Sequence, residues 1–229
     1  VPSKSPKDWQ NDVKKAISSV KKGQVMILSF MGTVKKNQTE KEFVDDFALS
    51  AKYALQTGAK ILEVNLSCPN IGNEGLVCYN LSVTEKALRA IRKVIGKTPL
   101  IVKTGYFEKD GELKKFVEII NKYADAVSAI NTIAAPVVDQ KGNQALPGSP
   151  MRLKSGVCGT VIRWAGLNMV QRLSDIRKKN KFNYKIIGVG GVMNASDYKK
   201  YIKAGADAVM SATGSMWNPY LAQEIKKSL

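Results

Sequence analysis

Histidine is absent from this 229-residue chain, and cysteine occurs only three times, as Cys68, Cys78 and Cys158. Without histidine the chain cannot form a Cys–His nucleophile pair or use imidazole as a metal ligand. There is no CxxC pair either, so we expect no metal site. Three cysteines leave at least one thiol unpaired in any disulfide scheme. This odd number indicates a reducing compartment, and we expect a cytoplasmic protein.

Long apolar runs are also missing from the sequence. No stretch approaches the roughly 20 apolar residues that a membrane span needs, and no secretory signal stands at Val1. We therefore expect no membrane partner. A composition of 44% apolar and 24% charged residues is typical of a globular protein. The length suits one α/β domain, which we predict over residues 1–229.

Acidic residues are few, with 19 Asp and Glu against 36 Lys and Arg, and the net charge is +17. Such an excess can indicate an anionic partner such as nucleic acid or a membrane surface. It can also reflect a lysine-rich solvated surface. Lysine pairs such as Lys14-Lys15 and Lys178-Lys179 are spread over nearly every predicted helix. This dispersion favours a solvated surface, so nucleic acid is not the expected partner, although a small anionic substrate would still be attracted.

Apolar strand-like segments alternate with amphipathic helical segments along the whole chain. The predicted strands are residues 24–32, 61–66, 99–104, 126–131, 184–189 and 208–212. Nearly continuous apolar strands are typical of a parallel sheet covered on both faces. From the second strand on, each strand ends in polar or glycine residues, as in a (β/α)8 barrel. The sequence therefore predicts a TIM barrel, although the six predicted strands are two short of a closed one.

Capping signals set the expected helix starts. Thr39 with Glu42 and Ser82 with Glu85 fit the capping-box pattern, Asn194 is an expected N-cap, and Asn218 is expected to start the last helix. The stretch from residue 133 to 159 is rich in glycine and proline and has no periodicity, so we interpret it as a functional loop.

Polar residues crowd the end of the second predicted strand, in the segment ILEVNLSCPNIGNEGLVC at residues 61–78. Asn65, Ser67, Cys68 and Asn70 could form an ordinary turn. However, buried unpaired amides and hydroxyls each cost ~1–3 kcal/mol, and ligands bind at this end of parallel strands. The residues from Asn70 to Gly75 between the two thiols carry two glycines and could move as a lid.

Lys103 is a lone ammonium in the apolar strand PLIVKT. A buried ammonium without a partner costs several kcal/mol. We therefore expect an anionic or electron-rich partner for Lys103, unless the side chain reaches solvent from the strand end.

Two glycine-bearing loops follow the last two strands, GVGGV at residues 188–192 and ATGS at residues 212–215. Each precedes a helix, so backbone N–H groups of both loops can surround one anion. In barrels, this pair of loops often binds a phosphate.

These segments together resemble the class 1 dihydroorotate dehydrogenases and the pyrimidine-reducing domain of dihydropyrimidine dehydrogenase. The motifs are NLSCPN at residues 65–70, Lys103 in its strand, INT at 130–132, GVCGTVIR at 156–163, GVGG and ATGS. The resemblance runs from about Trp9 to the C-terminus. It implies an FMN-dependent oxidoreductase with a (β/α)8 barrel that oxidises dihydroorotate to orotate in pyrimidine biosynthesis, and it suggests a homodimer.

The resemblance also assigns roles to single residues. By it, the FMN contacts would be Asn65, Lys103, Asn131, Gly159, Gly190, Gly191 and Thr213. The pyrimidine would be bound by Asn65, Asn70, Asn131 and Thr132. Lys103 would stabilise the reduced flavin near its N1/O2 edge, while a cysteine base takes the C5 proton and hydride passes from C6 to flavin N5.

Two cysteines of this chain match the catalytic base of one or the other of the two families that it resembles. Cys68 matches the base of the dihydroorotate enzymes, and Cys78 matches the later cysteine that serves in dihydropyrimidine dehydrogenase. We favour Cys68, because Asn70 matches the dihydroorotate enzymes where the other family has histidine.

The sequence departs from the family at its start. The family's first two strands, a flavin-binding lysine and a substrate-binding segment would precede Val1, so we expect a longer natural chain. Dihydropyrimidine reduction, a tRNA-dihydrouridine synthase activity and a non-catalytic barrel homologue are the alternatives. The electron acceptor is open between fumarate, a quinone, and NAD through an iron–sulfur partner.

Overall fold

The computed structural model describes residues 4–35, 37–68, 76–148 and 153–229. The chain forms two compact units, Val1–Lys103 with Gly111–Val127, and Thr104–Asp110 with Ser128–Leu229. Within the described ranges, no helix is long and apolar enough to cross a membrane.

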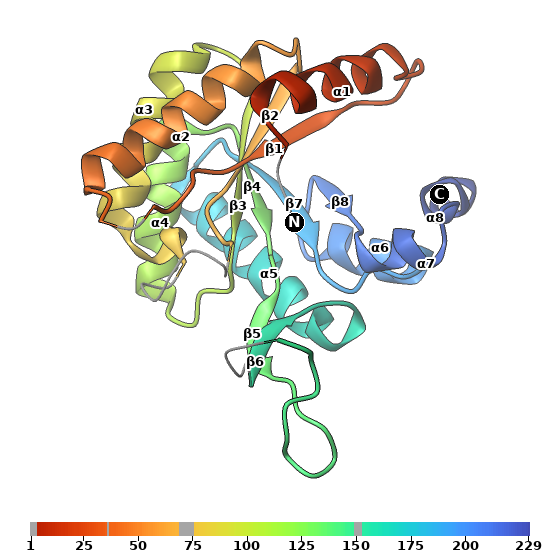
Figure 1. The fold of residues 1–229 in the computed structure, drawn as a ribbon. Helices are drawn as coiled ribbons and strands as arrows, with labels where there is room; N and C mark the ends of the chain where they lie inside the picture. Colours follow the sequence, from red (N-terminus) through yellow and green to blue (C-terminus); the bar gives the residue numbers. More distant parts are fainter. Residues whose placement is uncertain (1–3, 36, 69–75, 149–152) are drawn as a thin grey trace. The chain divides into compact units, whose positions relative to one another are not determined.

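The first unit is a parallel sheet with helices on one face (Figure 1). Its strands follow the order β1-β2-β3-β4, and the chain enters β4 at the end of this unit. Successive strands are joined by helices, as right-handed parallel crossovers require. The elements are α1 (Pro6–Ser18), β1 (Ile27–Phe30), α2 (Glu40–Leu55), β2 (Ile61–Asn65), η1 (Val77–Tyr79), α3 (Leu81–Ile95), β3 (Leu100–Thr104), α4 (Asp110–Tyr123) and β4 (Ala126–Ala129).

The core of this unit lies between the sheet and its helices. Leu88 and Ile91 on α3 are fully buried, and so are Leu62 and Val64 on β2. Their spacing follows the helical repeat on α3 and the two-residue repeat on β2. Burying each such side chain stabilises the fold by about 1.5–3 kcal/mol. The register pairs Leu62 with Leu100 and thereby aligns the ends of β2 and β3.

The second unit continues the sheet from β4 through β7 to β8, and β7 pairs in parallel with β8. An antiparallel pair, β5 with β6, projects from this unit as a hairpin (Figure 1). Its elements are β5 (Ile133–Pro136), β6 (Lys154–Val157), η2 (Thr160–Ile162), α5 (Arg163–Asn180), β7 (Lys185–Val189), α6 (Ala195–Lys203), β8 (Ala208–Met210), α7 (Thr213–Trp217) and α8 (Leu221–Lys227).

All six predicted strands are present as β1, β2, β3, β4, β7 and β8. Two predicted helix caps are also confirmed. Thr39 and Glu42 form both bonds of a capping box at the start of α2. Asn194 accepts a hydrogen bond from the Asp197 N–H at the start of α6. These features depend only on local sequence patterns, which explains why they could be predicted.

Three local predictions are wrong. Residues 133–159 are not simply a loop, because β5 and β6 form a hairpin there. Alanine, proline and glycine have low strand propensity, so these four-residue strands could not be recognised from the sequence. Ser82 does not cap α3; Asn80 does so, with its side chain accepting from the Val83 N–H. Asn218 does not start the last helix, since α7 ends just before it and α8 begins at Leu221.

We expect Asn80→Ala to destabilise the protein by about 1 kcal/mol, because the Val83 N–H loses its acceptor at the helix start. Ser82→Ala is the matched control and should change the free energy of unfolding by less than about 0.5 kcal/mol. Urea unfolding measures both values. A larger loss in the Ser82 variant would restore Ser82 as the cap.

Candidate active site

Asn65 and Lys103 lie side by side at the carboxyl ends of β2 and β3. They are direct partners in the parallel register. The Leu66 N–H donates to the Lys103 carbonyl oxygen at 3.1 Å and extends the pairing by one residue. Paired residues on neighbouring strands point to the same face of a sheet. The register therefore brings an amide and an ammonium together on the face opposite Leu62 and Val64.

Lys103 is half-buried at the end of β3, near the Glu63 carboxylate. Burial lowers the pKa of Lys103 below its ordinary value of 10.5, and the attraction of the Glu63 carboxylate partly opposes this. Glu63 is 8% exposed, and its Oε1 accepts from Ser29 Oγ at 2.9 Å. Its Oε2 is buried and has no hydrogen-bond partner in the described part of the chain. This face therefore carries a buried carboxylate close enough to influence the ammonium.

The Asn65 side chain is held by its own turn. Its Oδ1 accepts from the Ser67 N–H at 3.0 Å and from Ser67 Oγ at 3.1 Å. Ser67 is 1% exposed, so the turn packs against the interior. These bonds fix the plane of the amide and direct the chain toward Cys68.

The two candidate base residues differ in exposure. Cys68 is partly exposed, while Cys78 in η1 is fully buried. The Cys78 N–H donates to the Leu66 carbonyl oxygen at 2.9 Å, which draws η1 against the end of β2. The Cys78 thiol thus belongs to the core, and of these two thiols only that of Cys68 is open to a ligand. Asn70 and the predicted lid at residues 70–75 lie outside the described residues, which resume at residue 76.

Three loops of the second unit, those after β6, β7 and β8, approach one another closely at glycine residues. Gly191 has φ +65°, and a Cβ there would lie 2.7 Å from the Gly159 carbonyl oxygen and 2.9 Å from Thr160 Cα. A Cβ on Gly159, at φ +84°, would touch Thr213 Cγ2 at 3.7 Å. A Cβ on Gly214 would overlap the Val192 carbonyl oxygen. The loops after β6, β7 and β8 therefore pack this closely because Gly191 and Gly214 lack side chains, while Gly159 supplies a positive φ.

Two backbone N–H groups at the junction of these three loops have no hydrogen-bond acceptor in the described part of the chain. The N–H groups of Gly191 and Val192 donate to no acceptor within the described ranges. Successive free N–H groups in a tight turn form a concave site that suits an anion. The three-loop junction is therefore a candidate site for a phosphate group.

Asn131 and Thr132 lie at the base of the β5–β6 hairpin. The Asn131 N–H donates to the Thr104 carbonyl oxygen at 2.9 Å, and the Thr132 N–H donates to Asn131 Oδ1 at 2.8 Å. A Cβ on Gly156 would overlap the Thr132 side chain. The hairpin register pairs Ile133 with Val157, so β6 leads directly from these polar residues to Gly159.

The predicted site residues thus fall into two groups. Asn65, Cys68, Cys78 and Lys103 belong to the first unit. Asn131, Thr132, Gly159, Gly190, Gly191 and Thr213 belong to the second. The structure brings the members together within each group, and their convergence on one ligand stays a prediction.

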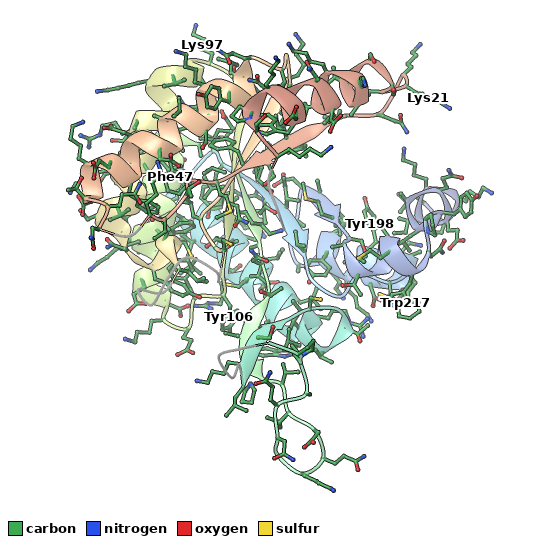
Figure 2. All side chains as sticks on the ribbon, viewed as in Figure 1. Lys21, Phe47, Lys97, Tyr106, Tyr198 and Trp217 are labelled. Carbon is green, nitrogen blue, oxygen red and sulfur yellow. The ribbon has the colours of Figure 1, made fainter. Side chains whose placement is uncertain are left out.

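Sequence reasoning missed several residues of this region. Glu63 is a charge inside the apolar strand ILEVN, the same signal that marked Lys103. Asp197 and Tyr201 on α6 contact the loop after β7 and gave no local signal in the sequence. Arg163 ends the motif GVCGTVIR, but the motif assigned no role to it. Lysines such as Lys21 and Lys97 are exposed and project away from the ribbon (Figure 2), in keeping with a solvated basic surface.

The fold and the candidate site together define a parallel α/β protein with polar side chains at the carboxyl ends of β2 and β3. A family model described as dihydroorotate dehydrogenase matches residues 8–229. The chain belongs to the dihydroorotate dehydrogenase family, which confirms the resemblance of the motifs.

Individual relatives agree with this assignment. Dihydroorotate dehydrogenase of Dictyostelium discoideum is 35% identical over 229 residues, which are 98% of this chain and 60% of the relative. The catalytic subunit of dihydroorotate dehydrogenase B (NAD(+)) from Brachyspira hyodysenteriae is 31% identical over 185 residues, 80% of this chain and 58% of the relative. The chain thus spans about 60% of the length of these curated relatives.

A solved structure shows the same fold. The structure of DHODH in complex with ferulenol from Eimeria tenella superposes with a TM-score of 0.76 at 18% identity, covering 99% of this chain and 64% of that one. The predicted fold class, a partial TIM barrel, is therefore confirmed.

We expect Gly191→Ala to destabilise the protein more than Gly142→Ala does. Both glycines have positive φ, which costs an alanine about 1–2 kcal/mol. Only at residue 191 would the added Cβ meet backbone, while residue 142 has open space. Urea unfolding of both variants measures the difference. Equal losses would contradict the close packing of the loops.

We expect Lys103→Met to stabilise the ligand-free protein by about 1 kcal/mol at pH 7. The folded pKa of Lys103 is lowered, so the unfolded chain binds its proton more tightly and ionised Lys103 opposes folding. As the pH rises toward 10.5, Lys103 loses its proton and destabilises the wild-type fold less. The difference in unfolding free energy between Lys103→Met and the wild type should therefore shrink over that range. Unfolding free energies between pH 7 and 10 measure this effect. Lys97→Met, at an exposed position, should show no such trend, and a pH-independent gain for Lys103→Met would contradict the explanation.

Proposed function

We propose that this protein is an FMN-dependent oxidoreductase that converts dihydroorotate to orotate in pyrimidine biosynthesis. The observation that carries the proposal is the register of β2 and β3. It places the Lys103 ammonium beside the Asn65 amide at the carboxyl end of a parallel sheet. Membership of the dihydroorotate dehydrogenase family supports the same activity.

The residues of the chain fit FMN in two respects. At the junction of the loops containing Gly159, Gly191 and Thr213, the N–H groups of Gly191 and Val192 lack an acceptor among the described residues and would be available to a phosphate. Lys103 is a half-buried cation that lacks a close ion pair in the described part of the chain, and it would offset negative charge on the reduced isoalloxazine ring. FMN, when bound, would accept the hydride that leaves C6 of dihydroorotate.

Amide and hydroxyl groups would bind the pyrimidine. Asn65 and Asn131 each have one side-chain oxygen engaged by the following backbone, which orients the rest of the amide. Thr132 adds a hydroxyl next to Asn131. Asn70 is expected to complete the set. The positive charge of the chain would attract the carboxylate of the substrate.

Cys68 would serve as the base that takes the C5 proton. Its thiol is partly exposed and follows directly on the turn that holds Asn65. The Cys78 thiol is fully buried beneath that turn, which supports Cys68 over the dihydropyrimidine dehydrogenase-type base. A homodimer in the cytoplasm remains the expected form.

The experiment is an anaerobic titration of the purified protein with dihydroorotate, followed by the visible flavin spectrum. The wild-type protein should be yellow and should bleach on addition of substrate. A colourless protein that takes up no added FMN would contradict the proposal and favour a non-catalytic homologue.

We expect Cys68→Ala to slow substrate-driven bleaching by at least about 100-fold, because proton abstraction loses its base. Cys78→Ala should bleach at close to the wild-type rate, and so should Cys158→Ala, which alters an exposed thiol. Stopped-flow absorbance measures the three rates. Fast bleaching by Cys68→Ala together with slow bleaching by Cys78→Ala would reverse the assignment.

A further inference from the structure

The carbonyl groups of residues 190–192, in the loop after β7, are each bound by a side chain of the second unit. Tyr201 Oη donates to the Gly190 carbonyl oxygen at 2.7 Å. Arg163 Nη1 donates to the Gly191 carbonyl oxygen at 3.5 Å. Ser211 Oγ donates to the Val192 carbonyl oxygen at 2.7 Å. Three consecutive peptide planes are therefore fixed through their oxygens.

Tyr201 reaches the loop through a slot formed by two glycines. The tyrosine is fully buried on α6. A Cβ on Gly166 would overlap its hydroxyl oxygen, and a Cβ on Gly188 would overlap its ring. The first glycine of GVGG therefore makes room for a tyrosine, whereas Gly191 permits the turn itself.

Asp197 forms an ion pair with the guanidinium of Arg163. It is 1% exposed, and its Oδ1 lies 2.7 Å from Arg163 Nη1 and 3.5 Å from Lys200 Nζ. Its Oδ2 accepts from the Met193 N–H at 3.2 Å. Because a buried carboxylate in such a pair is costly to leave alone, Arg163 and Asp197 depend on each other.

We propose that Tyr201, Arg163 and Asp197 are positioning residues that hold residues 190–192 with their N–H groups directed at the phosphate of the bound flavin nucleotide. The inference rests on the proposed function for the identity of the anion. Its structural basis is independent. The carbonyl oxygens of residues 190–192 are engaged, whereas the N–H groups of Gly191 and Val192 have no acceptor in the described part of the chain.

Tyr184 offers a matched control at the opposite end of β7. It is 1% exposed, and its Oη donates to the Leu173 carbonyl oxygen at 2.8 Å. Burial raises the pKa of both Tyr184 and Tyr201, so both phenols remain donors at working pH. The two tyrosines thus share burial, bond type and unit, and differ in whether the bonded carbonyl belongs to the glycine loop.

The experiment compares Tyr201→Phe with Tyr184→Phe in three measurements. Urea unfolding should show similar losses of stability. FMN affinity, followed by quenching of flavin fluorescence, should weaken about tenfold in Tyr201→Phe only, as loss of one buried hydrogen bond implies. In the ligand-free protein, the amide ¹⁵N order parameters of residues 190–192 should fall from about 0.85 to below about 0.6 in Tyr201→Phe only.

A second pair of variants keeps the test decisive if Tyr201→Phe fails to fold. Asp197→Asn retains the shape of the side chain and should weaken FMN binding, whereas Asp207→Asn alters the Arg177–Asp207 pair elsewhere in the unit and should not. Equal effects within both pairs of variants would overturn the inference. If the wild-type protein binds neither FMN nor inorganic phosphate, the proposed function fails, and the order parameters alone decide whether the network holds the loop.

Discussion

The parallel pairing of β2 with β3 is the constraint on which the rest of the candidate site depends. It is maintained by backbone hydrogen bonds and by the buried Leu62 and Leu100, and it holds the half-buried Lys103 near the Glu63 carboxylate. The ammonium and the Glu63 carboxylate are consequently retained on the inner face at a cost in stability. Such a cost is typical of a surface shaped for a ligand, because hydrophobic residues would make a more stable sheet there.

The second unit contains backbone N–H groups, those of Gly191 and Val192, that have no acceptor in the described part of the chain. Free N–H groups in a packed loop would normally find acceptors or water. Here the carbonyl oxygens of residues 190–192 are bound by Tyr201, Arg163 and Ser211, and glycines allow the three loops to approach one another. The N–H groups of Gly191 and Val192, on the other side of the turn, have no acceptor among the residues that the structure describes. Rigid support of this kind limits the entropy lost on binding.

Local patterns explain how much could be predicted. Apolar strands, capping residues and polar strand ends are written in consecutive residues, so the six strands and the positions of Asn65 and Lys103 follow from the sequence alone. The β5–β6 hairpin could not be predicted, because its pairing joins residues about 20 positions apart and these residues have weak strand propensity. The cap of α3 is Asn80 instead of Ser82; both residue types are acceptable caps, so the local sequence does not distinguish them.

The amino-acid sequence by itself determined the alternation of elements, the family and the chemical groups available at the strand ends. Those depend on residue type and on spacing along the chain. Only the tertiary structure decided that Cys78 is buried while Cys68 is not, that Glu63 acts on Lys103, and that Tyr201 bonds the glycine loop. Burial and contacts between distant residues arise when helices pack on the sheet, and no local pattern records them.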